Sequence, residues 1–198
     1  MKKTIFHAFP ALALGALLLA LPGCSTNTHG DDASPVFLTG EFTELPLEKL
    51  LVDATPLQFK TTTLRARLKV PGAASSQFLD VQIDSYFVRW SRSDGGKTAS
   101  KGETFGGDVI VPVEGTSTLN NYPYMTADNL LRPPLDALYP FNGGIDRDTG
   151  RTEIDQIGHV TWYGHTLSGQ AVVSNEASFN MIFRYGGVSG RVEGKLVR

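Results

Sequence analysis

The chain has 198 residues, with 18 lysine and arginine side chains against 20 aspartates and glutamates, a formal net charge of −2. Nucleic-acid binders carry a basic footprint, so this balance argues against DNA or RNA as a partner. The single cysteine, Cys24, excludes an internal disulfide, so a folded domain must be held together by its hydrophobic core.

Residues 1–23 have the pattern of a targeting segment. Two lysines precede an apolar run over residues 8–21, and a Pro-Gly pair ends that run just before Cys24. As a helix, the run would measure about 21 Å, short of the roughly 30 Å hydrocarbon core of a bilayer. We therefore predict that residues 1–23 are a signal peptide that is removed. Its removal takes away Lys2 and Lys3 and changes the formal charge from −2 to −4.

The residues at this boundary, Leu21-Pro22-Gly23-Cys24, resemble the lipobox of bacterial lipoproteins. The resemblance implies that the Cys24 thiol receives diacylglycerol, that the peptide bond before it is cut and that the new amino terminus is acylated. Two or three acyl chains hold a protein stably at a bilayer, because each buried methylene contributes about 0.8 kcal/mol. In enterobacterial lipoproteins, an aspartate directly after the cysteine tends to retain the protein at the inner membrane. Ser25 stands at that position here, so the resemblance implies that the protein is located at the outer membrane. The alternative is a plain signal peptide followed by an unmodified cysteine.

Residues 24–35 combine this cysteine with a polar stretch, STNTHGDDASP, that contains no large apolar residue. The composition predicts a flexible tether, which would span under about 20 Å on average. The folded domain is therefore expected over residues 36–198.

Three patterns in the first half of this domain predict β-strands. In residues 62–70, apolar side chains alternate with threonine, arginine and lysine, as in a half-buried strand. Residues 79–91 carry apolar side chains on both faces, which predicts a central strand covered on both sides near its second half. A turn is predicted at residues 93–96, SDGG. Residues 108–115 predict another strand, at an edge or a bulge because of Pro112.

The second half of the domain repeats this strand pattern. Residues 154–166 and 177–185 predict a pair of strands, and the link over residues 167–176 suggests a hairpin. The tail over residues 189–198 alternates again and predicts a closing strand.

Helical signal is sparse. Residues 45–54 and 127–138 have leucines at helical spacing, but Pro133 and Pro134 limit the second segment to about one turn on either side. At least six short strands with turn signals between them and little helix predict an all-β fold, an antiparallel sandwich of about seven strands.

Three strand segments carry a second resemblance: residues 85–96 (SYFVRWSRSDGG), 159–164 (HVTWYG) and 179–187. They are similar to strand sequences of Ig-like or fibronectin-III-like domains in bacterial envelope lipoproteins. The resemblance implies an Ig-like β-sandwich with one long irregular loop. It implies no particular activity, because such sandwiches host many unrelated functions.

The long loop is expected over residues 120–150, and loops beyond about 15 residues are uncommon in compact domains unless they have a role. Aromatic side chains among prolines and glycines suggest a surface that stacks on a sugar or anchors a protein partner. The candidate ligand-binding residues are Tyr122, Tyr124, Tyr139 and Phe141. The alternative is that these side chains, with Met125, fold back as a lid over one end of the sandwich.

The sequence predicts no cofactor and no metal site. Asp146 and Asp148 suggest calcium, but Gly150 comes one position too early for an EF-hand loop, which favours a hydrogen-bonded turn. His159 and His165 share a strand face but would lie about 20 Å apart, too far to bind one zinc ion.

Hydrolase patterns are incomplete in this sequence. Residues 187–191, GVSGR, begin like a nucleophile elbow but have arginine in place of the second glycine. Asp80 and Asp84 would lie about 13 Å apart on an extended strand, wider than a glycosidase pair. We therefore predict no enzyme, although residues distant in sequence can still converge in space.

These observations together predict a lipid-anchored protein of the bacterial envelope that acts as a structural or protein-interaction module. Its expected partners are the membrane, through the lipid on Cys24, and an envelope protein. The alternative is a carbohydrate- or small-ligand-binding module that uses residues 120–150.

Overall fold

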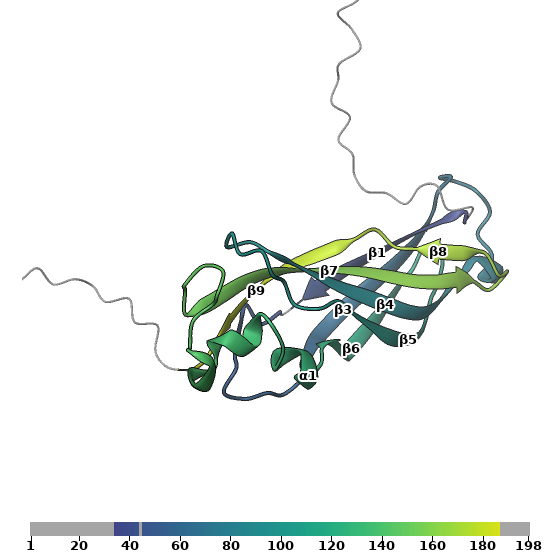
Figure 1. The fold of residues 1–198 in the computed structure, drawn as a ribbon. Helices are drawn as coiled ribbons and strands as arrows, with labels where there is room; N and C mark the ends of the chain where they lie inside the picture. The colour runs from purple at the N-terminus through teal and green to yellow at the C-terminus, as the bar shows by residue number, and fades with distance from the viewer. Residues whose placement is uncertain (1–33, 44, 187–198) are drawn as a thin grey trace, which may run out of the picture.

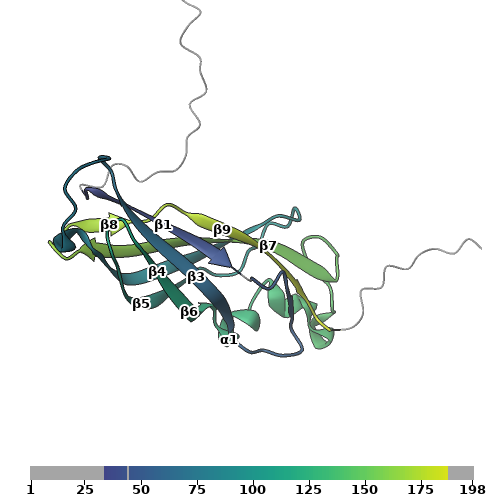
Figure 2. The same cartoon turned by 180° about the vertical axis from the view of Figure 1, so that it is seen from behind.

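The structure is a computed structural model that describes residues 34–43 and 45–186. In this part of the chain two β-sheets face each other (Figure 1, Figure 2). The three-stranded sheet has the order β1-β3-β6, formed by β1 (Val36–Thr43), β3 (Leu57–Leu68) and β6 (Thr116–Met125). The other sheet has the order β2-β9-β7-β4-β5, with β8 paired to β7. Its strands are β2 (Glu48–Leu50), β4 (Val81–Arg92), β5 (Glu103–Val111), β7 (Glu153–Thr166), β8 (Ala171–Val173) and β9 (Ala177–Arg184).

The prediction of an all-β sandwich with little helix is confirmed. The described residues form nine strands, against about seven predicted. Strands β2 and β8, of three residues each, are too short to leave a periodic signal, and β1 and β6 were not among the predicted strand ranges. All strand pairs are antiparallel except that of β2 with β9.

Strand β3 shows why the alternating pattern predicted a strand. Leu64 and Ala66 are fully buried between the sheets, whereas Arg65 and Arg67 are exposed on the outer face. The strand starts five residues before the predicted range and ends at Leu68, two residues before its predicted end.

Strand β4 is central, as predicted, but it is not covered on both faces. Its pairing with both neighbours shifts between Ile83 and Ser85, so that Asp84 is an extra, bulged residue. Because successive side chains of a strand point to opposite faces of the sheet, one extra residue moves every later side chain to the other face. As a result, Ile83 and Tyr86 both point into the core. The outer face after the bulge carries Ser85, Phe87, Arg89 and Ser91.

The strands predicted over residues 154–166 and 177–185 match β7 and β9 to within one residue. The strand predicted over residues 108–115 is formed only in part, because β5 starts at Glu103 and ends at Val111. Strand β5 is an edge strand that ends immediately before Pro112. Strands β7 and β9 pair with each other, and a turn with Gly169 at φ +88° leads from β7 into β8.

The helix suggested for residues 45–54 is not formed. This segment contains β2, whose backbone pairs with β9. Of its leucines, only Leu51 is fully buried, whereas Leu47 is 73% exposed, so the segment presents no apolar helical face to the core.

An aromatic cluster fills the space between the sheets. The Phe179 ring of β9 lies 5.4 Å from Phe42, 5.5 Å from Phe59, 5.6 Å from Trp90 and 5.2 Å from Tyr124, centroid to centroid, in edge-on contacts. Such pairs add about 0.5–1.5 kcal/mol each beyond the burial of their area.

The molecule is elongated along its strands (Figure 1, Figure 2). At one end β1 starts at Val36, opposite the end of β3, and β4 starts at Val81, opposite the ends of β5 and β7. We call this end the tether end, because β1 follows the predicted tether. The other end carries α1 (Figure 1). The 14 residues of β7 place the two ends about 46 Å apart.

Several predictions lie outside the described residues: the signal peptide, Cys24, nearly all of the tether, the 187–191 pattern and the strand at 189–198. Within the described ranges, no helix has the length and apolarity needed to cross a membrane.

Candidate functional site

Residues 126–151 cover the end of the sandwich opposite the tether end, and we call them the lid. They contain α1 (Ala127–Leu130) and the 3-10 helices η2 (Leu135–Leu138) and η3 (Pro140–Asn142). Three lid leucines are fully buried against the core: Leu130, Leu135 and Leu138. The short helical turns expected on either side of the proline pair are therefore present, and much of the expected loop is packed structure.

Hydrogen bonds fix the start of the lid to strand β5. The Thr126 hydroxyl caps α1 by accepting the Asn129 N–H at 3.3 Å. The Glu103 carboxylate accepts the Thr126 N–H at 3.0 Å and the Asn129 side-chain amide at 2.9 Å. The buried Asn129 also donates to the Lys101 carbonyl at 2.8 Å.

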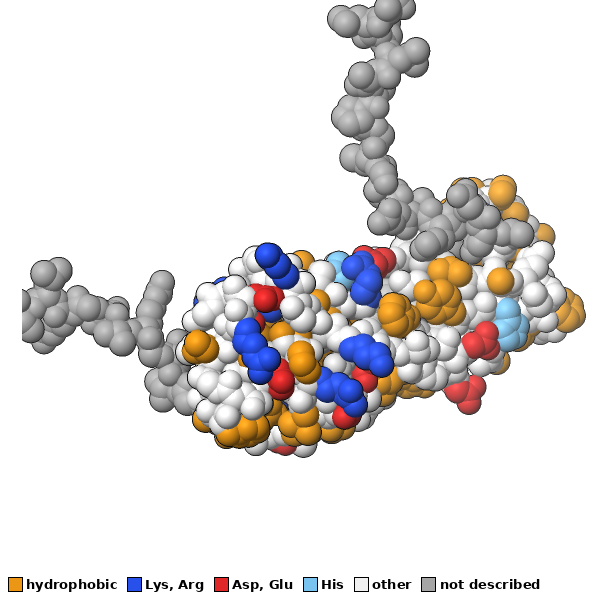
Figure 3. Space-filling view, viewed as in Figure 1, with side chains coloured by type: hydrophobic (Ala, Val, Ile, Leu, Met, Phe, Trp, Pro, Cys, Tyr) orange, Lys and Arg blue, Asp and Glu red, His pale blue; other side chains and the backbone are white. Residues whose placement is uncertain are grey.

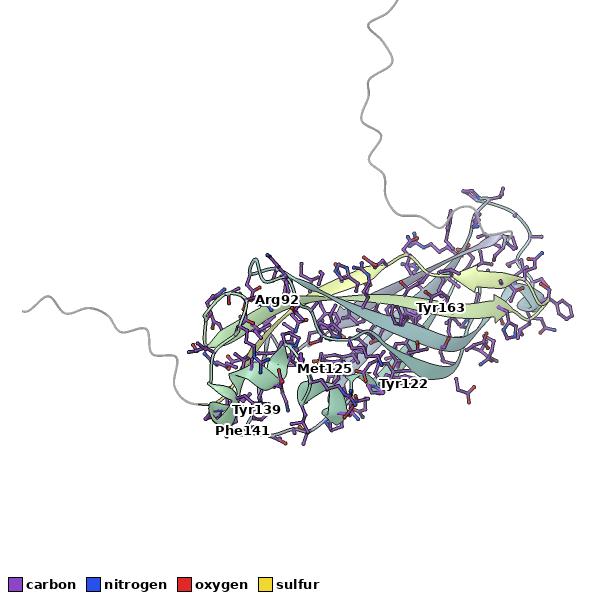
Figure 4. The ribbon with its side chains drawn as sticks, in the orientation of Figure 1. Arg92, Tyr122, Met125, Tyr139, Phe141 and Tyr163 are labelled. Carbon is purple, nitrogen blue, oxygen red and sulfur yellow. The ribbon has the colours of Figure 1, made fainter. Side chains whose placement is uncertain are left out.

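A buried ion cluster centred on Arg92, whose place Figure 4 labels, holds the lid to strand β4. The Arg92 guanidinium donates to both Asp94 oxygens at 2.8 Å and to Asp146 at 2.7 Å. It also donates to the Thr98 carbonyl at 3.0 Å. The side chains of Arg92, Asp94 and Asp146 are 2%, 0% and 2% exposed. Each charge is therefore shielded from water but hydrogen-bonded, the condition under which buried charges are tolerated.

The carboxylates of this cluster are held in the charged form. Burial raises the pKa of Asp94, but hydrogen bonds from Arg92 and from the N–H groups of Asp155 and Gly96 outweigh it, so that the pKa lies well below its usual range. Burial also raises the pKa of Asp146, but its hydrogen bonds, including that from Arg92, and the charge of Arg92 together outweigh burial, so the pKa of Asp146 lies below its usual value as well.

The two aspartates considered for calcium have other roles. Asp146 accepts the Thr149 N–H at 3.0 Å in addition to its bond from Arg92. Asp148 accepts the N–H groups of Lys97 and Thr98 at 2.8 and 2.7 Å. The hydrogen-bonded turn is therefore confirmed. Within the described ranges, histidine, cysteine and acidic side chains form no group of three that could hold a metal ion.

Two of the four candidate ligand-binding residues are not on a loop. Tyr122 and Tyr124 belong to strand β6. Tyr124 is 0% exposed and packs 4.7 Å from the Phe59 ring, so the prediction that it stacks on a ligand is wrong. Tyr122 is partly buried beside Tyr86, at 6.2 Å between ring centroids. Tyr122 and Tyr124 are two residues apart, as side chains on one face of a strand are. This period was missed because residues 120–150 were predicted to form a loop.

The other two candidates lie together on the lid (Figure 4). The rings of Tyr139 and Phe141 are 5.4 Å apart, and the ring of Tyr185, which follows β9, lies 5.3 Å from that of Tyr139. Phe141 is 80% exposed and Tyr185 is 36% exposed, whereas Tyr139, which contacts both, is buried. These three side chains form an aromatic strip at the outer end of the molecule.

Charged groups and a small cavity lie near this strip. Figure 3 shows lysine and arginine side chains gathered over the lid half of the molecule, with acidic groups among them. Exposed lysines and arginines in this region include Lys97, Lys101 and Arg147. A cavity of about 150 Å³ lies between the proline pair of the lid and the Asp146–Asp148 turn.

A wider groove, of about 790 Å³, lies near the tether end on the outer face of the three-stranded sheet. It is lined by the exposed side chains of Arg65, Arg67 and Phe37, and by the loop that follows β3. Lys69 lies over the Phe37 ring at 5.2 Å.

The two histidines of the described chain lie in separate clusters, as their spacing predicted. His165 is within 2.9 Å of Asp84. His159 lies between Ser91 and Glu176, at 2.8 Å from each.

Comparison with protein-family models, with curated proteins and with solved structures finds no match to this chain. The Ig-like resemblance and the lipobox therefore stay predictions from the sequence.

Sequence patterns do not point to several residues of these sites. Arg92 and Asp94 are visible as neighbours of a turn, but their partner Asp146 is 54 residues from Arg92. The alternating pattern places Tyr185 only as a strand residue. Ser91, His159 and Glu176 come from three separate parts of the chain, and no local pattern connects them.

Proposed function

We propose that this chain is a lipid-anchored protein of the bacterial envelope whose sandwich works as a protein-interaction module. The observation that carries the proposal is the lipobox-like Leu21-Pro22-Gly23-Cys24, which stands shortly before the start of β1 at Val36. Even fully extended, the stretch over 25–35 spans only about 40 Å, so the domain would stay close to the membrane. Ser25 favours the outer membrane as the site of anchoring.

The fold supports a particular orientation for this module. Strand β1 starts at the tether end, so this end would face the lipid surface, and the lid would lie about 46 Å further out. The aromatic strip of Tyr139, Phe141 and Tyr185 would therefore be presented to partners. Exposed aromatic side chains next to cations are typical anchors of protein interfaces.

Anchoring is tested by growing cells with an alkynyl fatty acid and detecting the label on the protein. Wild type is expected to incorporate the label, and a Cys24→Ser variant is expected to incorporate none. An unlabelled wild-type protein, or equal labelling of the two proteins, would refute the anchor.

The interaction surface is tested with a photo-crosslinking amino acid in place of Phe141. The matched control places it at Phe78, an apolar residue that is 61% exposed at the tether end. We expect one dominant protein adduct from position 141 and none of that mass from position 78. Equal adducts from both positions, or none from 141, would contradict a partner site on the lid.

A carbohydrate-binding module is the second candidate, because Phe141 and Tyr185 offer exposed ring faces on which a sugar can stack. If the chain binds carbohydrate, the wild-type protein should give a binding signal on a glycan array, and the Phe141→Ala variant should lose that signal. The control is Tyr163→Ala, which removes a ring that is 39% exposed on strand β7. A signal that both variants keep would exclude the lid as the sugar site.

A further inference from the structure

Three side chains that are distant in sequence meet on the outer face of the six-stranded sheet. Ser91 is on β4, His159 is on β7 and Glu176 immediately precedes β9. The Ser91 Oγ lies 2.8 Å from His159 Nε2, and His159 Nδ1 lies 2.8 Å from Glu176 Oε1. The order is hydroxyl, imidazole and carboxylate, with each link within hydrogen-bond distance.

The charge of Glu176 and the tautomer of His159 set the direction of the two hydrogen bonds. Burial raises the pKa of Glu176, but hydrogen bonds from Arg89 and His159 outweigh it and hold the pKa below its usual range. Glu176 is therefore an anion near neutral pH and can only accept, so His159 Nδ1 donates to it. In the imidazole tautomer that carries its one proton on Nδ1, Nε2 is the acceptor and the Ser91 hydroxyl donates to it. This is the arrangement that prepares a serine hydroxyl to lose its proton to a base.

The surroundings leave the trio accessible and add a positive charge. The side chains of His159 and Glu176 are 17% and 32% exposed. Arg89 precedes Ser91 by two residues on the same strand face, about 7 Å along the strand, and bonds Glu176 at 3.1 Å. Its guanidinium, 52% exposed, lies beside the Glu176 carboxylate and adds a positive charge to this face of the sheet.

We propose that Ser91, His159 and Glu176 form a catalytic triad that hydrolyses carboxylic esters on the open face of the six-stranded sheet. The proposal does not depend on the lipid anchor. Ser91 Oγ forms a bond to the ester carbonyl carbon while its proton passes to His159 Nε2. The bond to the alcohol oxygen then breaks, and that oxygen takes the proton from Nε2.

Water completes the cycle by the same route. It gives a proton to Nε2, attacks the acyl-serine and releases the carboxylic acid, and Ser91 Oγ recovers its proton from Nε2. One ester and one water are thus converted to one acid and one alcohol. Glu176 is a positioning residue, because it holds the imidazole in the required tautomer and stabilises the imidazolium.

The neighbouring side chains indicate the class of ester. Ile157 lies directly opposite Ser91 on β7, and Phe87 lies four residues before Ser91 on the same face of β4. Ile157 is a half-buried apolar side chain that an acyl chain on Ser91 can contact, whereas Phe87, also half-buried, lies about 13 Å further along the strand and could contact only a long chain. The substrate class is therefore an ester of an apolar acyl group.

The experiment uses the purified full mature protein in detergent. A biotinylated fluorophosphonate, which reacts with activated serines, is added, and the modified peptide is identified by mass spectrometry. Hydrolysis of p-nitrophenyl butyrate is followed on the same samples. We expect modification of Ser91 in the wild type, no modification at that position in Ser91→Ala, and ester hydrolysis reduced by about 10²-fold or more in His159→Gln.

The matched control is Ser178→Ala, which removes an exposed serine directly opposite His159 on β9 and should leave both readouts unchanged. Melting temperatures of all variants show whether a loss of activity is a loss of folding. Glu176→Asp should keep more activity than Glu176→Gln at a similar melting temperature, because a carboxylate can only accept from Nδ1, whereas the amide of glutamine can also donate to Nδ1 and so favour the other tautomer.

Two results would overturn the proposal. The first is that, in the wild-type protein, Ser91 reacts with the fluorophosphonate no faster than Ser178 does. This comparison does not depend on whether any variant folds. The other is a folded His159→Gln variant that reacts as the wild type does. Either result would make the trio a structural hydrogen-bond network only.

Discussion

Replacing Arg92 with methionine tests how the lid is held to the sandwich. The substitution keeps an unbranched side chain of similar length and removes the four hydrogen bonds that Arg92 makes to Asp94, Asp146 and the Thr98 carbonyl. Two aspartates that are 0% and 2% exposed would then be buried without their cation.

Breaking a buried ion pair by removing one partner costs about 3–5 kcal/mol. That is a large part of the roughly 5–15 kcal/mol by which domains are usually stable. At about 2–4 °C per kcal/mol for a domain of this size, the melting temperature should fall by roughly 6–20 °C. The free energy of unfolding is measured by urea titration at pH 7. The matched control is Arg132→Met, which removes an exposed ion pair with Asp128 and should change stability little.

The effect should depend on pH with a defined sign. Asp94 and Asp146 have pKa values lowered in the folded wild type, so their contribution is present above the usual aspartate pKa of about 3.9 and is lost as the pH falls below it. Without Arg92, burial would favour their protonated forms. The stability difference between wild type and Arg92→Met should therefore shrink as the pH is lowered from 7 toward 4. A difference under about 1 kcal/mol at pH 7, or one that does not change with pH, would refute the reasoning.

Three further predictions concern the packing of the sandwich, and all three are measured by denaturant unfolding. Tyr86→Phe should destabilise the protein by about 1 kcal/mol, because the Tyr86 hydroxyl donates to the Pro123 carbonyl. Tyr124→Phe should be neutral or stabilising, since that buried hydroxyl has no hydrogen-bond partner among the described residues; a loss as large as that of Tyr86→Phe would contradict this. Gly164→Ala should cost about 1–3 kcal/mol, because a Cβ there would lie 2.1 Å from the Gln82 carbonyl oxygen and would push β7 away from β4. A variant as stable as the wild type would show that the two strands are not held as closely as described.

The sequence predicted the fold wherever a strand has one buried face and a regular period. Strands β3, β7 and β9 meet that condition, and their positions followed from alternation alone. Strand β4 does not, because the bulge at Asp84 changes the parity, and no single residue type signals a bulge. Strand β2 forms by pairing with β9, which is far away in the sequence, so the local sequence pattern does not predict it.

The candidate sites were less predictable for a related reason. Aromatic composition drew attention to Tyr122, Tyr124, Tyr139 and Phe141, but composition alone does not separate a buried ring such as Tyr124 from an exposed one such as Phe141. The contacts of Ser91 with His159 and of Arg92 with Asp146 form between residues that are far apart in the sequence. Such contacts require the sheet register, which a local pattern does not supply.

The central claim is that the folded domain is fastened to a lipid surface through Cys24, and mass spectrometry of the native product tests it most directly. The claim predicts a mature protein whose first residue is Cys24, with a diacylglyceryl group on its sulfur. An unmodified thiol at Cys24, or a mature chain that starts after it, would contradict the claim and remove the basis for the proposed orientation.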